Sequence, residues 1–115
     1  MRSRPTSDDF PVTRLQPAVR RVQLVFEPDV DMSDVAETLE LSRLAADALY
    51  GPERMALEAS WRLDRPSGTV VIDTSTAPGR AVATIFLGYA RREFGEQAVR
   101  VTRAGTAPRP GREVR

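Results

Sequence analysis

The sequence predicts one α+β domain in which two helices cover one face of a four-stranded antiparallel sheet. Four segments alternate apolar and polar residues with the period of a half-buried strand. Two longer segments repeat apolar residues every three or four positions, which is the period of an amphipathic helix. Glycine and proline separate these segments, and 115 residues suffice for a single hydrophobic core.

The first strand is expected at residues 21–27, where alternate apolar residues share one face. The first helix is expected to begin at a capping box, residues 31–34, because an Asp there accepts hydrogen bonds from the free backbone N–H groups of the first turn. Gly51 and Pro52 are expected to end this helix just after Tyr50. Its buried stripe is predicted to contain Val35, Leu39, Leu41, Ser42, Leu44, Ala45, Ala46, Ala48 and Leu49.

Strict alternation predicts a second strand at residues 55–63, the clearest strand pattern in the chain. A turn at 64–68 is expected to join it, as a hairpin, to a third strand at 69–73. A second helix at 79–94 and a last strand at 97–103 follow. The helix is predicted to bury Val82, Ile85, Phe86 and Tyr89, and to pack closely through a strip of small residues, Ala81, Thr84 and Gly88.

The resulting order, β-α-β-β-α-β, resembles the ferredoxin-like fold, a two-layer sandwich with one open sheet face. The sheet side of the core is predicted to comprise Val22, Leu24, Phe26, Met55, Leu57, Trp61, Val70, Ile72, Val99 and Val101. Residues 1–20 and 104–115 are rich in proline and polar residues, and they are expected to form a flexible arm and a flexible basic tail around the domain at 21–103.

Composition excludes several kinds of chemistry. The chain has no Cys, His, Lys or Asn, so thiolate, imidazole and lysine Schiff-base catalysis are absent, and no metal or cofactor is expected. Residues 22–103 hold nine Arg against thirteen acidic residues, a net charge of −4 that disfavours a nucleic-acid partner. The longest apolar stretch, 81–90, is too short to span a bilayer, and no signal segment is evident. We therefore expect a cytoplasmic protein without a membrane partner.

The open sheet face is the main candidate for function. Opposite charges surround small residues and valines on it, which suits a self-complementary or partner-binding surface, although a solvated face is the simpler alternative. We expect a non-enzymatic interaction or regulatory module that forms a homodimer, or docks on another protein, through this face or an edge strand. The residues assigned to the face are Arg21, Gln23, Val25, Glu27, Ala56, Glu58, Ser60, Arg62, Val71, Asp73, Arg100 and Thr102.

Two further hypotheses involve small molecules. Regulatory domains of the ACT kind resemble this chain in element order only, and that resemblance implies a ligand between protomers near residues 28–32. The third hypothesis is an enzyme acting on an anionic substrate at a helix start that offers hydroxyls, backbone N–H groups and an arginine. Ordinary helix capping explains the same residues. The anion-site candidates are Thr74, Ser75, Thr76, Gly79 and Arg80.

Overall fold

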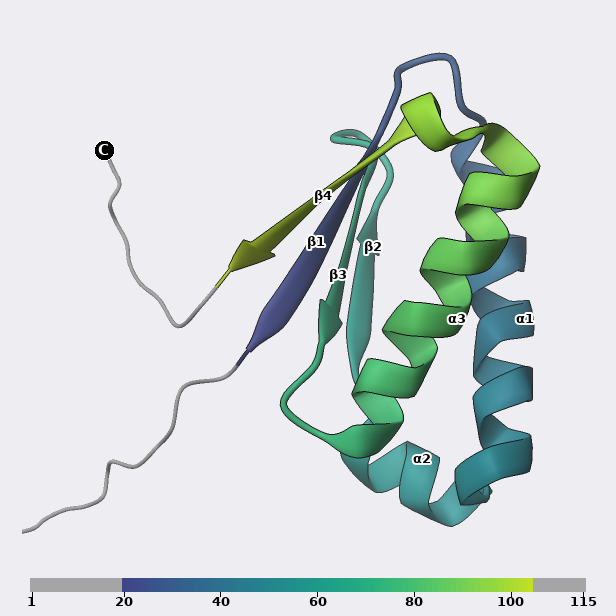
Figure 1. Ribbon diagram of the computed structural model, residues 1–115, viewed down its shortest axis with the longest axis vertical. Helices are drawn as coiled ribbons and strands as arrows, with labels where there is room; N and C mark the ends of the chain where they lie inside the picture. Colours follow the sequence, from purple (N-terminus) through teal and green to yellow (C-terminus); the bar gives the residue numbers. More distant parts are fainter. Residues whose placement is uncertain (1–19, 105–115) are drawn as a thin grey trace, which may run out of the picture.

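The computed structural model describes residues 20–104, in which a sheet packs against a layer of helices (Figure 1). The predicted arm at 1–20 and tail at 104–115 lie outside these residues, apart from Arg20 and Ala104. The elements in chain order are β1 (Arg21–Phe26), α1 (Met32–Tyr50), α2 (Pro52–Glu58), β2 (Trp61–Asp64), β3 (Thr69–Asp73), α3 (Ala77–Phe94), the short 3₁₀ helix η1 (Glu96–Ala98) and β4 (Val99–Ala104).

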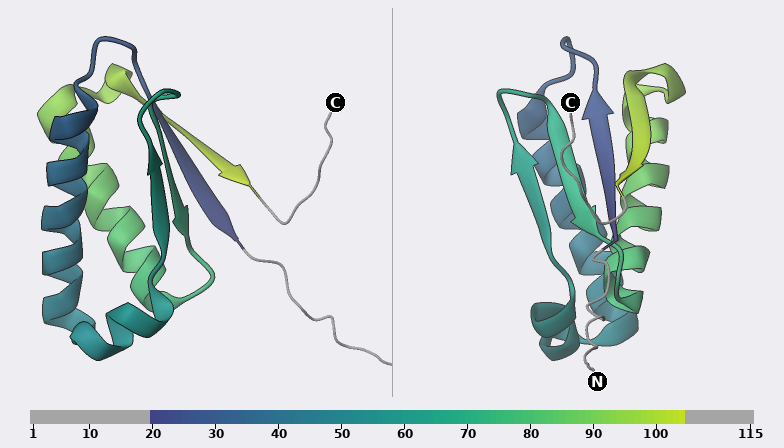
Figure 2. Two further views of the ribbon diagram at one scale, coloured as in Figure 1. Left: turned by 180° about the vertical axis from the view of Figure 1, so that it is seen from behind. Right: turned by 90° about the vertical axis from the view of Figure 1, so that its left-hand side faces the viewer.

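The sheet is antiparallel throughout, with β1 in its interior. β1 pairs with β3 on one side and with β4 on the other, and β2 pairs with β3, which gives the order β2-β3-β1-β4. The two long helices, α1 and α3, cover one face of this sheet (Figure 2). The predicted α+β class, the four-stranded antiparallel sheet and the β2–β3 hairpin are confirmed. The prediction of two helices is wrong, because residues 20–104 contain three α-helices.

The additional helix, α2, replaces the first half of the predicted second strand. Pro52 occupies its first turn, where the fixed φ of proline and its missing N–H suit a helix start. Helical spacing buries Met55 in the core and leaves Leu57 86% exposed, although the alternating pattern placed both side chains in the core. The remaining residues are good helix formers, and Arg54 forms a salt bridge with Glu58 one turn later. β2 is consequently limited to Trp61–Asp64.

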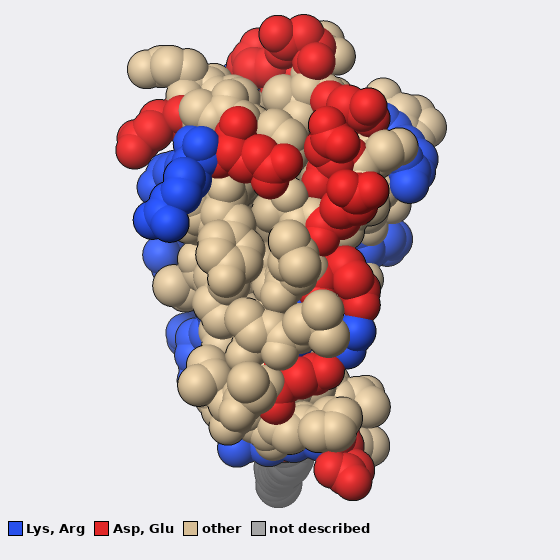
Figure 3. Space-filling model, turned by 90° about the vertical axis from the view of Figure 1, so that its right-hand side faces the viewer, with Lys and Arg blue, Asp and Glu red and all other residues tan. Residues whose placement is uncertain are grey.

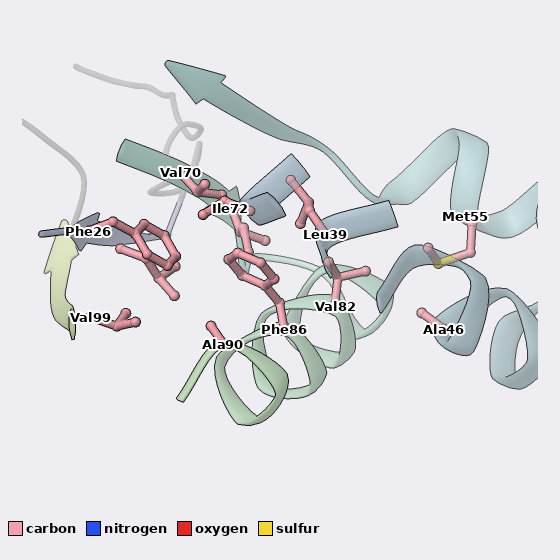
Figure 4. Packing of buried hydrophobic residues seen from close by; sticks show 12 residues of the cluster. Phe26, Leu39, Ala46, Met55, Val70, Ile72, Val82, Phe86, Ala90 and Val99 are labelled. Atoms are coloured by element: carbon pink, nitrogen blue, oxygen red, sulfur yellow. The ribbon is translucent and has the colours of Figure 1, made fainter. Parts of the chain in front are cut away.

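The core lies between the sheet and the two long helices (Figure 4). The Phe26 ring lies 6.1 Å from that of Phe86 and 5.9 Å from that of Phe94, so these rings join β1 to α3. Met55 attaches α2 to the same cluster near Ala46. The buried hydrophobic residues are Leu24, Phe26, Val35, Leu39, Ala46, Met55, Val70, Ile72, Val82, Phe86, Ala90 and Val99.

The helix ends follow local chemistry that the sequence indicated. The Asp31 carboxylate accepts a hydrogen bond from the Ser33 backbone N–H at 2.8 Å, as expected for the residue that caps α1. Gly51 ends α1 with a φ of 88°, a left-handed conformation that favours glycine. α3 begins at Ala77, two residues before the predicted start, because Thr76 is its capping residue.

Candidate functional site

The open face of the sheet carries most of the residues that the sequence assigned to it. Two rows cross the four strands, Arg62, Val71, Gln23 and Thr102, followed by Asp64, Thr69, Val25 and Arg100. Arg21 and Asp73 pair in a third row, and Glu27 and Ser60 directly flank β1 and β2. Ala56 and Glu58 belong to α2, so assigning them to this face was wrong. Val71 and Val25, both half-buried, therefore lie in the middle of the face. The strands on either side, β2 and β4, carry the exposed Arg62 and Arg100.

The predicted anion site at residues 73–80 is occupied by its own hydrogen bonds. The Asp73 carboxylate accepts from the Ser75 backbone N–H at 2.8 Å and from the Ser75 hydroxyl at 2.5 Å. The Thr76 hydroxyl donates to the Glu58 carbonyl oxygen at 2.8 Å and accepts from the Gly79 N–H at 3.1 Å. The first Thr76 contact ties the end of α2 to the start of α3, and the second caps α3. This is the helix-capping alternative to an anion site. Thr74 and Arg80 instead line a separate pocket between α3 and the strands β1 and β4.

The long helices expose large apolar side chains that the sequence predicted to be buried. On α1, Leu41 is 58% exposed, Leu44 51% and Leu49 67%, and on α3 Tyr89 is 39% exposed. Leu41 and Tyr89 line a hollow of about 400 Å³ between α1 and α3, together with Thr38, Arg92 and Glu93. Single exposed leucines are ordinary on protein surfaces, but neighbouring ones on one helix indicate a contact surface. We name this surface, formed by the outward side chains of α1 and α3, the helix-layer face.

Small residues form the α3 part of the helix-layer face. Gly88 and Thr84 are exposed, and a Cβ at Gly88 would have no atom within 4 Å. The predicted packing of the small-residue strip inside the domain is therefore wrong. Val82, Phe86 and Ala90 are buried and lie on the side of α3 that faces the sheet. Thr84 and Gly88, which follow Val82 and Phe86 by two positions, therefore lie on the outward side of the helix. Because its side chains are small, this part of α3 forms a low surface beside the exposed leucines of α1.

Charges divide the helix-layer face into two sides (Figure 3). A column of acidic residues follows α1 and includes exposed Asp34, Glu37 and Glu40, whereas exposed Arg91 and Arg92 lie on the last turn of α3. Between residues 20 and 103, neither Arg91 nor Arg92 forms a salt bridge. Uncharged surface separates the two sides over the middle of the face in Figure 3, whereas near its top acidic side chains also lie directly beside the basic ones.

One arginine belongs to the acidic side. The Arg43 guanidinium donates to Glu40 and, at 2.7 Å, to Asp47. The hydrogen bond from Arg43 holds the pKa of Glu40 below its ordinary value, and the same contact raises the pKa of Arg43. The Arg43 contact therefore stabilises the ionised form of Glu40.

Residues 20–104 contain neither a metal-binding cluster of acidic side chains nor a membrane-spanning helix. Their Asp and Glu side chains form no cluster of three or more that could hold a metal ion, and none of their helices combines the length and apolar character needed to cross a bilayer. No protein-family model, curated protein or solved structure matches this chain.

Proposed function

We propose that this protein is a non-enzymatic interaction module that forms a two-fold symmetric homodimer through its helix-layer face. The observation that carries the proposal is the exposed set of leucines on α1 beside the shallow strip on α3, flanked by acidic residues on one helix and arginines on the other. A second copy of the same surface offers both complementary parts, knobs against a strip and acids against arginines.

One hydrogen bond shows which residues of α1 and α3 lie at the same height along the two helices. The Thr38 hydroxyl donates to the Glu93 carboxylate at 2.6 Å, so these two positions lie at the same level of the antiparallel helix pair. Both helices rise equally per residue. Moving along them from this contact places Glu40 near the level of Arg91, and Leu44 near the level of Gly88. Glu40 and Leu44 of α1 thus each have a counterpart at nearly the same height on α3.

One orientation of the second copy uses this match. A two-fold axis parallel to the helices preserves height and exchanges left with right, so α1 of one protomer lies on α3 of its partner. Leu44 then faces the strip at Gly88, and the acidic side of α1 faces Arg91. An axis across the helices brings the acidic column of each protomer against itself, and like charges repel.

The size of the surface sets the expected strength. Helices of 18 and 19 residues are roughly 27 Å long, and side by side they are roughly 20 Å wide. Two such faces bury roughly 1,000 Å², which is at the low end for specific complexes. We therefore expect a reversible dimer that dissociates on dilution in the micromolar range.

Two further parts of the proposal concern fold and location. We propose that the domain is a ferredoxin-like sandwich with α2 added before β2, supported by the strand order β2-β3-β1-β4 and by two long helices on one face. We also propose that it acts in the cytoplasm, as expected from the sequence. The non-enzymatic assignment rests on the missing Cys, His and Lys side chains.

Light scattering of the full chain from about 1 to about 100 μM tests the dimer, since this range brackets a micromolar dissociation constant. We expect the mass to rise towards twice the monomer mass in the wild type and to stay at the monomer value in Leu44→Glu. Leu44 is half exposed, so circular dichroism should show an unchanged fold in this variant.

Thr102→Glu is the matched control, because it adds the same charge to an exposed position on the open sheet face. It should dimerise like the wild type. Monomeric wild-type protein throughout the range would refute the homodimer. Loss of the dimer in Thr102→Glu but not in Leu44→Glu would place the interface on the open sheet face and refute the helix-layer face.

A further inference from the structure

We infer that the pocket between α3 and the β1–β4 edge of the sheet binds a small amphipathic anion, a molecule with an apolar body and a carboxylate, sulfonate or phosphate group. The pocket has a volume of about 460 Å³, within the usual range for small-molecule sites. It lies where β1 and β4 diverge from α3 in Figure 1, on the sheet side of that helix. It is separate from the proposed contact between protomers, apart from Thr84, which lines it and also belongs to the strip on α3.

The floor of the pocket is apolar. Val22 and Leu24 of β1 and Val101 of β4 contribute from the sheet, and Ala83 and Leu87 contribute from α3. Val22, Val101 and Leu87 are half-buried although they face the core side of the domain. Apolar surface that the protein leaves partly wet gains free energy when an apolar ligand covers it.

The rim of the pocket is cationic. Arg20, Arg80 and Arg103 line it, as does Arg21, although strand alternation places the Arg21 side chain on the open sheet face, and no acidic residue lines the pocket. None of the four forms a salt bridge within residues 20–103. Arg80 donates one hydrogen bond, to the Thr74 carbonyl oxygen at 3.3 Å, which leaves most of its five N–H donors available. The nearest carboxylate in register, Asp73 beside Arg21, is engaged by Ser75.

Arg103 brings a charge from the edge strand β4 to the apolar floor. It is the register neighbour of Val22, in a row that continues through Ile72 to Trp61 on the helix-covered side of the sheet. An apolar residue at this position would extend the core, whereas an arginine brings a charge to the edge of an apolar floor. The backbone opposite is fixed, because the Thr74 N–H donates to the Arg20 carbonyl oxygen at 2.8 Å. Arginines thus approach the floor from both the sheet and α3.

These features select the class of ligand. Guanidinium groups pair with carboxylate, sulfonate or phosphate oxygens in a two-pronged geometry. A purely inorganic anion leaves the apolar floor uncovered, and a neutral apolar molecule leaves the arginines without a partner. A molecule that joins both parts is the best fit.

A fluorescence titration with anilinonaphthalenesulfonate tests the inference on the full-length protein. The neutral parent compound without the sulfonate, phenylnaphthylamine, reports apolar adhesion alone, and octanoate and inorganic phosphate serve as competitors. We expect the sulfonate to bind more tightly than its parent, and octanoate to displace it better than phosphate. Arg80→Gln and Arg103→Gln should each weaken its binding about threefold to tenfold, the effect of losing a partly exposed charge pair.

Two variants control for other sites. Arg62→Gln removes an exposed arginine from the open sheet face, and Leu44→Glu removes the apolar centre of the helix-layer face. Both should bind the sulfonate like the wild type, and thermal melts should show that the pocket variants remain folded. Equal binding of the sulfonate and its parent, unchanged binding in both pocket variants, or loss of binding in Leu44→Glu would each overturn the inference. Because Leu44→Glu breaks the dimer without altering the pocket, failure of this inference is distinguishable from failure of the dimer.

Discussion

Gly79, in the first turn of α3, occupies a position without room for a side chain. A Cβ there would lie 2.0 Å from the Asp73 carbonyl oxygen and 3.1 Å from the Thr76 hydroxyl oxygen. The nearer atom belongs to the backbone, so it cannot rotate away as a side chain does. Gly79→Ala must therefore displace the loop at residues 73–76 that joins β3 to α3.

The cost follows from three terms. Forcing an extra methyl group into packed structure typically costs about 1–3 kcal/mol. Displacing Thr76 weakens a helix cap that contributes about 1 kcal/mol. Alanine has a higher helix propensity than glycine, which offsets about 0.5–1 kcal/mol of this loss in the free energy of unfolding. We expect a net loss of about 2 kcal/mol in the free energy of unfolding, which lowers the melting temperature of a domain of this size by roughly 8–16 °C.

Gly88→Ala is the matched control on the same helix. Its Cβ would meet no atom within 4 Å, so the variant should gain about 0.5–1 kcal/mol from helix propensity alone. Urea denaturation followed by circular dichroism, at a concentration below the range of association, measures both variants. A Gly79→Ala protein as stable as the wild type would refute the close approach of α3 to Asp73. Destabilised Gly88→Ala would refute the outward placement of this strip.

Two further predictions test the remaining structure. Met55→Ala should cost about 2–4 kcal/mol of unfolding free energy because it empties a core position, whereas Leu57→Ala should be nearly neutral; equal costs in urea denaturation would support the strand pattern instead of α2. An NMR titration should find the Glu40 pKa below the ordinary glutamate value, and Arg43→Gln should move it back up. A lowered pKa in the folded state means that this contact stabilises above the ordinary glutamate pKa and is lost as pH falls through the lowered one. An unchanged Glu40 pKa in Arg43→Gln would contradict the contact.

Local patterns predicted most of the fold because they agree with the long-range packing. Alternation at β1 and at β3, a capping Asp before α1 and glycines after α1 and α3 each act over a few residues. Residues 52–58 differ because two signals compete there. Alternating apolar residues favour a strand, whereas Pro52 after Gly51 favours a new helix, and packing of Met55 decides for the helix.

The candidate surfaces were harder to predict for a physical reason. Periodicity identifies the apolar stripe of a helix, but not how much of that stripe the sheet can cover. Leu39 and Leu44 lie on different sides of α1, so a single sheet buries Leu39 and leaves Leu44 half exposed. The arginine-rimmed pocket combines residues from β1, β4 and α3, and only the register of the sheet brings Arg103 beside Val22.

The most direct test of the proposed homodimer is a charge exchange measured by sedimentation equilibrium. Glu40→Arg and Arg91→Glu should each weaken dimerisation, because each places like charges across the interface. The double variant should restore it, since two-fold symmetry pairs position 40 of one protomer with position 91 of its partner. Recovery in the double variant is the expected result. Dimerisation that is unaffected by either single change, or weakened additively by both, would contradict α1 packing on α3 of a second copy.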